Sequence, residues 1–183
     1  IILNEIMTIT NPKKILCSIS GLREGSLSID HLKNTKETEI FNKSIEYIAS
    51  KRGDLGSTYQ KYFKFILPVF DGNEHYNKKL LYLACVLSHM DWGLGAFQKA
   101  ELVFQETLNT PLLRLTHKER IQLALSCYWR YCSIKYNPKF EYLTFLNNNE
   151  IFSSKQVGAA LRFSQSLTSI STIFLEEFKL YKS

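Results

Sequence analysis

The stretch LLYLACVL, residues 80–87, is the longest apolar run in the chain and decides the class of fold. A membrane span needs about 18 apolar residues, so this run is far too short to be one. Its length fits a buried helix. A helix that is apolar on every side belongs at the centre of a bundle. The stretch therefore predicts a helical domain assembled around residues 80–87, with no membrane span.

Helical patterns flank this run on both sides. Thr116 and Glu119 have the capping-box spacing that begins a helix, and Ser154 is placed to cap the last one. We expect Pro68 and Asp71-Gly72 to close the helix that precedes the central run. Apolar residues at helical spacing predict the remaining helices, which cover Phe41–Ile48, Tyr59–Phe70, Leu94–Leu108, Ile121–Cys132 and Val157–Leu167.

The helix that follows Thr116 divides into two faces. Its core stripe is formed by Ile121, Ala124, Leu125, Tyr128 and Cys132. Its opposite, polar stripe is formed by Glu119, Gln122, Ser126, Arg130 and Ser133. The ordinary interpretation of such a stripe is a solvated helix face.

The two ends of the chain predict something other than a bundle. Residues 1–10 read as a helix that Asn11-Pro12 ends, and KKILCSI, residues 13–19, reads as a strand. A glycine-flanked turn and a short helix over residues 26–32 follow, which together make half of an α/β unit. The end, FLEEFKLYKS, reads as an unfinished strand. Because the chain begins with Ile1 in mid-pattern, we expect it to be a piece of a longer protein.

Composition excludes some classes of protein and favours others. The chain has 183 residues, of which 45% are hydrophobic and 13% aromatic, so it has enough apolar material for a sizeable core. Its net charge of +6 favours a polyanionic partner, but the basic residues are scattered, and nucleic acid is not expected as the partner. No secretion signal opens the sequence. The four cysteines form no CxxC pair, which predicts reduced thiols in a cytoplasmic protein.

The turn GLREG, residues 21–25, has two local interpretations. Gly21 and Gly25 permit close backbone approach, and the N-terminus of a following helix attracts anions, so Arg23 is a candidate phosphate ligand. Alternatively, Arg23 and Glu24 fix a junction between domains. The local chemistry favours the junction, because no GxGxxG or P-loop pattern accompanies the glycines.

Four stretches in order carry a resemblance to a known family. SISGLREG (residues 18–25) resembles the signature that closes an actin-like catalytic half. LLYLACVLSHMDWG (80–93), PLLRLTHKERIQLALSCYWRY (111–131) and VGAALRFSQSLTS (157–169) resemble successive helices of an HD-related helical domain. Together they resemble the Ppx/GppA phosphatases, which are exopolyphosphatases and guanosine pentaphosphate phosphohydrolases. The resemblance spans residues 2–168.

The resemblance implies a mainly α fold: an HD-like helical bundle preceded by the last α/β piece of an actin-like (ribonuclease H-like) domain. It divides the chain into residues 1–33, the end of the catalytic half; 34–168, the helical domain; and 169–183, the start of a C-terminal β segment. In the complete enzyme, an upstream carboxylate would activate water to release terminal phosphate from polyphosphate or pppGpp, with Mg²⁺ offsetting phosphate charge. This chain alone would contain no catalytic residue, bind no cofactor and be inactive.

A metal site within this chain is not expected. HD phosphohydrolases bind metal through an adjacent His-Asp pair with further His and Asp residues. The matching place here is Ser88-His89-Met90-Asp91, where His89 and Asp91 are two positions apart and diverge on a helix. The other histidines, His31, His75 and His117, show no ligand spacing. The pattern predicts an HD-like fold that has lost its metal.

A basic surface is the remaining candidate for binding. As the resemblance implies, the helical domain extends a polyanion path, and Lys118, Arg120 and Arg130, with Arg162 nearby, lie on the helices concerned. Polyphosphate or pppGpp would be the partner, and the resemblance is also compatible with a homodimer. The alternatives are a non-catalytic helical module that binds phosphate or a nucleotide, and a module for oligomerisation.

Overall fold

The computed structural model describes residues 1–15, 21, 37–51, 58–72, 74, 76–89, 95–112, 115–136, 138–168 and 173–181. The chain forms two compact units, Ile1–Glu37 and Thr38–Ser183. None of the helices in these ranges is both long enough and apolar enough to cross a membrane.

The first unit contains helix α1, Ile2–Thr10. Asn11 ends it in the left-handed conformation, with φ 41°, and donates its backbone N–H to the Met7 carbonyl. Asn tolerates this conformation better than most residues, and Pro12 cannot continue the helix. The predicted end of the helix at Asn11-Pro12 is thus confirmed. No residue of α1 is buried.

The predicted α/β piece lies mostly outside the described residues. Residues 13–15 of the expected strand are described and lie in no strand, whereas residues 16–19 lie outside the described ranges. The predicted helix over residues 26–32 also lies outside them. The part of the GLREG turn that the structure describes is Gly21, which has no regular secondary structure.

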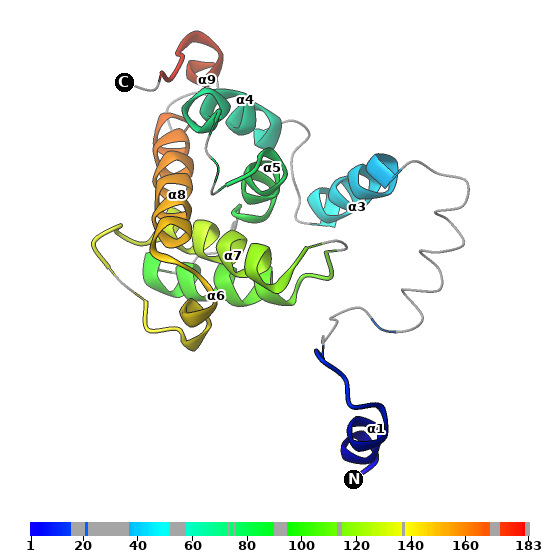
Figure 1. Cartoon of the computed structure of the whole chain (residues 1–183). Coiled ribbons are helices and arrows are strands. Elements are labelled where there is room, and N and C mark those ends of the chain that lie inside the picture. Colours follow the sequence, from blue (N-terminus) through cyan, green and yellow to red (C-terminus); the bar gives the residue numbers. More distant parts are fainter. Residues whose placement is uncertain are drawn as a thin grey trace. The chain divides into compact units, whose positions relative to one another are not determined.

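The second unit is a helical bundle, as the central apolar run predicts (Figure 1). Across the described ranges, no strand occurs. Its helices are α3 (Glu37–Lys51), α4 (Thr58–Phe70), α5 (Lys78–Leu87), α6 (Ala96–Asn109), α7 (His117–Tyr131), the 3₁₀ helix η1 (Glu141–Phe145), α8 (Asn148–Thr168) and α9 (Phe174–Glu177).

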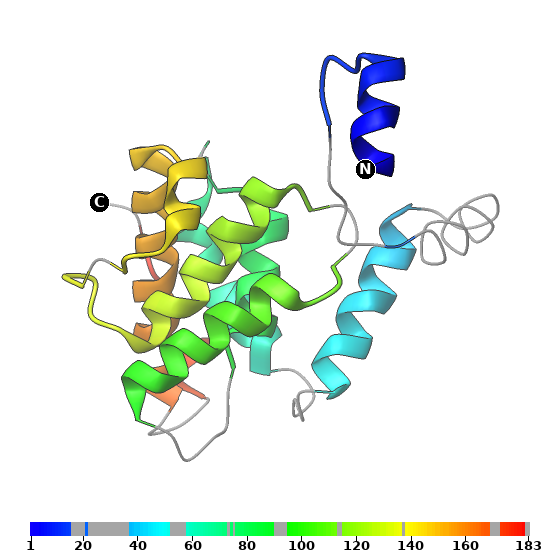
Figure 2. The ribbon, with the colours of Figure 1, turned by 90° about the horizontal axis from the view of Figure 1, so that it is seen from below.

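Helix α7 lies at the centre of this bundle. It packs against α6, α8 and α5, and Figure 2 shows α6 and α7 running side by side. Every residue from Arg120 to Arg130 is buried. The N-terminus of α7 carries the predicted capping box, because Thr116 Oγ1 accepts from the Glu119 N–H at 3.1 Å and Glu119 Oε2 accepts from the Thr116 N–H at 2.8 Å.

Helix α5 confirms the prediction from which the fold was derived. Leu80, Leu81 and the five residues from Leu83 to Leu87 are all buried, and Tyr82 lies partly exposed. They belong to a core cluster that also takes Ile45 and Ala49 from α3. A second buried cluster, which includes Phe104, Tyr128 and Trp129, lies between α6, α7 and η1. Burial of such side chains is the main favourable contribution to folding, at about 2 kcal/mol each.

Three local predictions are wrong. Asp71-Gly72 directly follow the end of α4 at Phe70, as predicted, but Pro68 lies inside the last turn and does not close the helix. The buried Ile66 and Phe70 on either side of Pro68 hold this last turn in place. Ser154 does not cap α8 but lies within it. The helix begins after Asn147, whose Oδ1 accepts from the Glu150 N–H while Glu150 Oε2 accepts from the Asn147 N–H, both at 2.9 Å. This pair repeats the capping-box geometry with Asn as the cap.

The expected C-terminal strand is the third correction. Residues 173–181 contain α9 and no strand. Leu175 of α9 is buried in the core cluster, and α9 packs against α4 and α8. Packing of Leu175 against α4 and α8 therefore holds this segment in place as a helix, and the segment does not depend on pairing with a strand.

Candidate functional site

The polar stripe of α7 is buried, which is the main difference between the sequence-based expectation and the structure. Gln122, Ser126 and Arg130 occur one turn apart and therefore lie on one side of the helix. Their exposed fractions are 5%, 0% and 1%, respectively. The interpretation of this side as a solvated face is wrong for these three residues, because α5, α8 and Tyr76 cover it.

Arg130 makes hydrogen bonds to two other helical segments. Its Nη1 donates to Ser88 Oγ at the C-terminal cap of α5, at 2.6 Å, and its Nε donates to Gln165 Oε1 of α8, at 2.9 Å. Its Nη2 lies 3.4 Å from His89 Nδ1. Because a guanidinium has donors only, this contact requires an unprotonated Nδ1.

Aromatic side chains complete the surroundings of Arg130. The guanidinium carbon lies 5.5 Å from the centre of the Tyr62 ring and 5.6 Å from that of Tyr131, within cation–π range. The Tyr131 hydroxyl donates to the Ser88 carbonyl at 2.8 Å. Arg130 and Tyr131 thus hold both the side chain and the backbone of Ser88.

The middle of the stripe continues the polar network. The Tyr76 hydroxyl donates to Ser126 Oγ at 2.8 Å, and Ser126 Oγ donates to the Gln122 carbonyl at 2.9 Å. Burial raises the pKa of Tyr76 well above its usual value. Burial likewise raises the pKa of the neighbouring Cys85 thiol, although the Arg130 charge acts in the opposite direction. These groups stay protonated at neutral pH, so neither is an activated nucleophile or a base.

The hydrogen-bond partners that the structure gives Arg130 are all uncharged. A buried cation is normally compensated by an anion, and it otherwise depends on hydrogen bonds and ring faces to offset the loss of water. Chemically, this arrangement holds three helices and orients the Ser88-His89 segment. Arg130 is therefore a positioning residue here.

Arg120 does not lie on a basic surface either. It is 5% exposed, and its guanidinium donates to three carbonyls at the end of α6 and just beyond: Leu108 (3.5 Å), Thr110 and Leu112 (2.9 Å). These carbonyls lack helical partners, so Arg120 caps α6. Burial lowers the pKa of this guanidinium.

The other expected basic residues are exposed but engaged. Lys118 forms an ion pair with Glu150, with Nζ–Oε1 at 2.8 Å, beside a small polar pocket of about 190 Å³ that Glu74 and Glu119 also line. Arg162 Nη1 donates to the Cys132 carbonyl just after α7, at 3.2 Å.

Arg120 and Arg130, two of the predicted phosphate-binding residues, do not converge on one site. Arg120 and Arg130 are ten positions apart on α7, which is roughly 15 Å along the helix axis. Arg23, together with the junction residues Glu24 and Gly25, lies outside the described ranges. Phosphate binding by Arg23, Arg120 and Arg130 stays a prediction. For Arg120 and Arg130, a phosphate would have to reach side chains that are buried in this structure.

Within the ranges that the structure describes, no three His, Cys, Asp or Glu residues lie close enough together to hold a metal ion. His89 is half-buried beside Arg130, whereas Asp91 lies outside these ranges. The inference that His89 and Asp91 do not share a metal thus stays a prediction from spacing.

A groove that the sequence did not indicate lies between α4 and the segment around α9. It encloses about 410 Å³, and Lys61, Lys64 and Lys179 line it over an apolar floor. In the sequence, Lys61 and Lys64 fall on one side of the α4 pattern, but Lys179 is more than a hundred positions away. Only the packing of α9 on α4 brings them together.

No protein-family model matches the chain, and no curated protein matches its sequence significantly.

Proposed function

We propose that this chain is the C-terminal portion of an exopolyphosphatase-type phosphohydrolase, which releases terminal phosphate from polyphosphate or pppGpp. One observation carries the proposal. Three of the four stretches that resemble the Ppx/GppA family lie on α5, α7 and α8 and their flanks, and Arg130 joins all three through Ser88, His89 and Gln165. The residues that carry the resemblance are thus spatially connected, as parts of one functional domain would be.

The role of this chain in such an enzyme is support. The helical unit would flank the cleft and lengthen the path of the polyanion, while the water-activating carboxylate lies upstream, as the resemblance implies. Mg²⁺ would belong to that upstream cleft. The described part of this chain has no carboxylate cluster that fits it.

Phosphate release from polyphosphate and from pppGpp, in the presence of Mg²⁺, tests the proposal. We expect the full-length gene product to be active and the 183-residue chain to be inactive. Removal of residues 34–183 from the full-length protein should raise KM for long polyphosphate more than for short polyphosphate, because only long chains reach the helical unit. Activity in neither protein would exclude a hydrolase, and equal activity in both would place the active site within this chain.

A non-catalytic binding module is the second candidate function. The net charge of +6 favours it, because a polyanion can be attracted to this chain without an upstream catalytic half. Equilibrium dialysis of pppGpp and polyphosphate against the 183-residue chain distinguishes the two functions. Tight binding, combined with an upstream sequence that has no Gly-rich phosphate loops, would favour the binding module.

A further inference from the structure

The groove between α4 and α9 combines an apolar floor with exposed aromatic rings. Phe65 and Leu175 are buried at its base, and Pro68 and Phe178 line its sides. Phe178 is 54% exposed. Phe163 of α8, 48% exposed, stacks on Phe65 with ring centres 6.3 Å apart and extends the apolar surface beyond the groove. Grouped exposed aromatic side chains beside a concave surface are typical of protein-binding sites.

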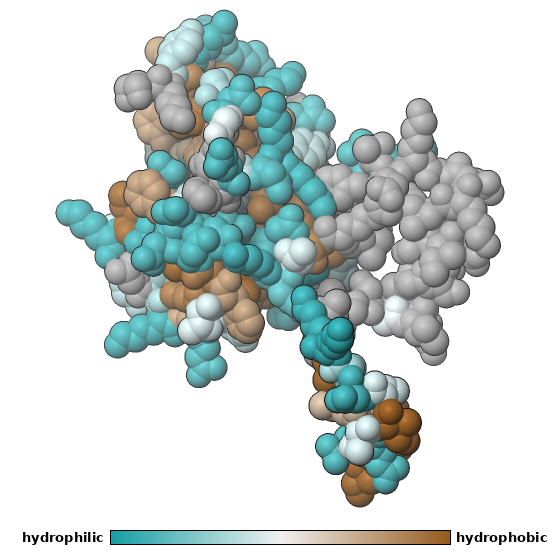
Figure 3. Space-filling view, viewed as in Figure 1, coloured by the Kyte–Doolittle hydropathy of each residue, from teal (hydrophilic) through white to brown (hydrophobic). Residues whose placement is uncertain are grey.

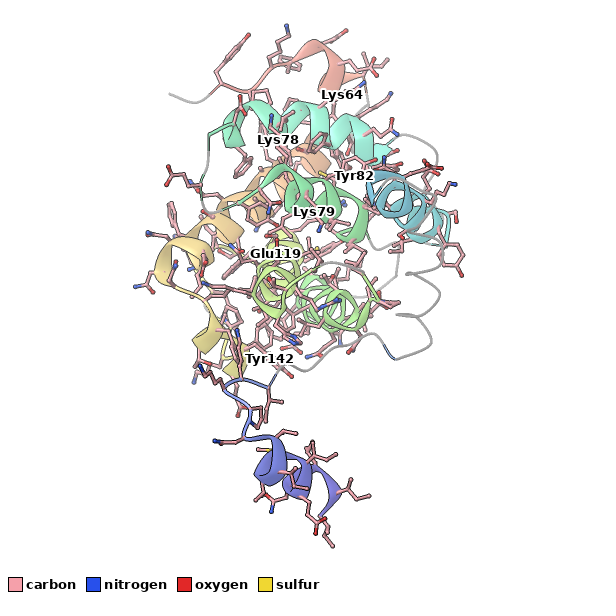
Figure 4. All side chains as sticks on the ribbon, turned by 45° about the vertical axis from the view of Figure 1, so that its right-hand side comes forward. Lys64, Lys78, Lys79, Tyr82, Glu119 and Tyr142 are labelled. Carbon is pink, nitrogen blue, oxygen red and sulfur yellow. The ribbon has the colours of Figure 1, made fainter. Side chains whose placement is uncertain are left out.

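Positive charges outnumber negative charges among the residues that line the groove. Lys61 Nζ forms an ion pair with Glu176 Oε1 at 2.9 Å, which joins α4 to α9 across the groove. Lys64 and Lys179 are exposed, and neither has an ion-pair partner in the part of the chain that the structure describes. Figure 4 places Lys64 between α4 and α9. The groove therefore presents two uncompensated positive charges.

Figure 3 shows apolar and polar surface side by side over α4 and α9. A ligand that matches this surface needs both characters. An inorganic polyanion gains no binding free energy from Phe178, because its phosphates are hydrated and an apolar ring offers them no hydrogen-bond donor. A purely apolar ligand leaves Lys64 and Lys179 unused. A volume of about 410 Å³ holds a few side chains, so the groove suits a short peptide segment.

We propose that this groove binds an acidic peptide segment of a partner protein. A large apolar side chain of the peptide packs on Phe178 and Pro68, and its carboxylates face Lys64 and Lys179. The apolar contact supplies most of the affinity, while the lysines set specificity and the rate of association. This inference is independent of the hydrolase proposal, because it requires neither the upstream half nor phosphate release.

Selection of a random twelve-residue peptide library against the full 183-residue chain tests the proposal. We expect the selected peptides to be rich in Asp and Glu and to share a Phe, Leu or Trp. Fluorescence polarisation with the best selected peptide should give a Kd that Lys64→Glu/Lys179→Glu raises by more than about tenfold, and that Phe178→Ala raises by about tenfold. All three side chains are exposed, so these variants should fold, which circular dichroism checks.

The matched control is Lys135→Glu/Lys139→Glu, which reverses two exposed lysines outside the groove and should leave Kd unchanged. Binding that both double variants weaken equally would overturn the proposal, since net charge alone would then explain it. Selected peptides without acidic residues would overturn it as well. A third outcome would assign the groove to a polyanion instead. In that outcome, polyphosphate competes with the peptide, and polyphosphate binding is lost in Lys64→Glu/Lys179→Glu but is unaffected by Phe178→Ala.

Discussion

Arg130 Nη1 and Ser88 Oγ lie 2.6 Å apart and join residues that are 42 positions apart in the chain. The contact fastens the middle of the bundle, α7, to the end of the apolar helix α5. Since Arg130 also reaches Gln165 of α8, one side chain holds three helices in register. The stability of the helical unit should therefore depend strongly on it.

Arg130→Ala should lower the free energy of unfolding by about 3 kcal/mol, because it leaves buried acceptors without a donor and opens a cavity. Arg130→Met retains most of the volume and removes the buried charge, so its cost should be smaller, about 1–2 kcal/mol. Arg162→Ala, at an exposed site, should cost less than about 1 kcal/mol. Urea unfolding measures all three, and equal costs for Arg130→Ala and Arg162→Ala would refute a central role for Arg130.

Gly158→Ala should destabilise the chain by about 2 kcal/mol through overpacking between α7 and α8. A Cβ atom at Gly158 would lie 2.5 Å from Trp129 Cβ and 2.8 Å from the Ser126 carbonyl oxygen. Gly95→Ala is the control, since the nearest atom to its added Cβ, Gln98 Oε1, is 3.7 Å away. Thermal unfolding should show a clear loss for the first variant and a change of under about 1 kcal/mol for the second. A neutral Gly158→Ala would show that the two helices can separate at no cost.

Cys85 should resist alkylation in the folded chain. Burial raises the pKa of its thiol above the usual value of 9.0, so the reactive thiolate is scarce and also inaccessible at pH 8. Iodoacetamide labelling followed by peptide mass spectrometry should leave Cys85 unmodified in buffer and modify it fully in 8 M urea. Rapid labelling of Cys85 without denaturant would mean that the α5–α7 interface opens readily.

The chain should lose stability as pH rises above about 9. Tyr76 and Cys85 have folded-state pKa values raised above their usual 10.0 and 9.0, so the unfolded chain releases these protons at a lower pH than the folded one. The contribution of these two groups to the free energy of unfolding is fully present below about pH 9. It declines as pH rises through the folded-state pKa values, because the unfolded state then binds fewer protons than the folded state. Urea unfolding at several pH values between 8 and 11 should show the decline. Tyr76→Phe should make it shallower, and an unchanged slope in this variant would exclude Tyr76 as a source.

Several elements could be predicted from the sequence because their causes are local. The capping box of Thr116 and Glu119 involves side chains three positions apart, and the end of α1 follows from the backbone preferences of Asn11-Pro12. Predictions from local preferences failed where tertiary packing outweighed those preferences. Pro68 costs α4 a hydrogen bond, but buried neighbours keep the helix intact to Phe70.

The candidate site could not be predicted in the same way. Periodicity separates a polar from an apolar side of a helix, but it does not say whether water or other helices meet the polar side. Gln122, Ser126 and Arg130 therefore appeared as a surface stripe, and the lysines of α4 and Lys179 appeared unrelated.

The sequence by itself determined that a helical unit forms around the apolar run Leu80–Leu87, because helix-forming patterns and caps act over a few residues. Only the tertiary structure decided which polar residues are buried and which lysines share a groove. Those outcomes depend on contacts between segments far apart in the chain, such as Arg130 with Ser88 and α4 with α9, and their geometry is set by how whole helices pack.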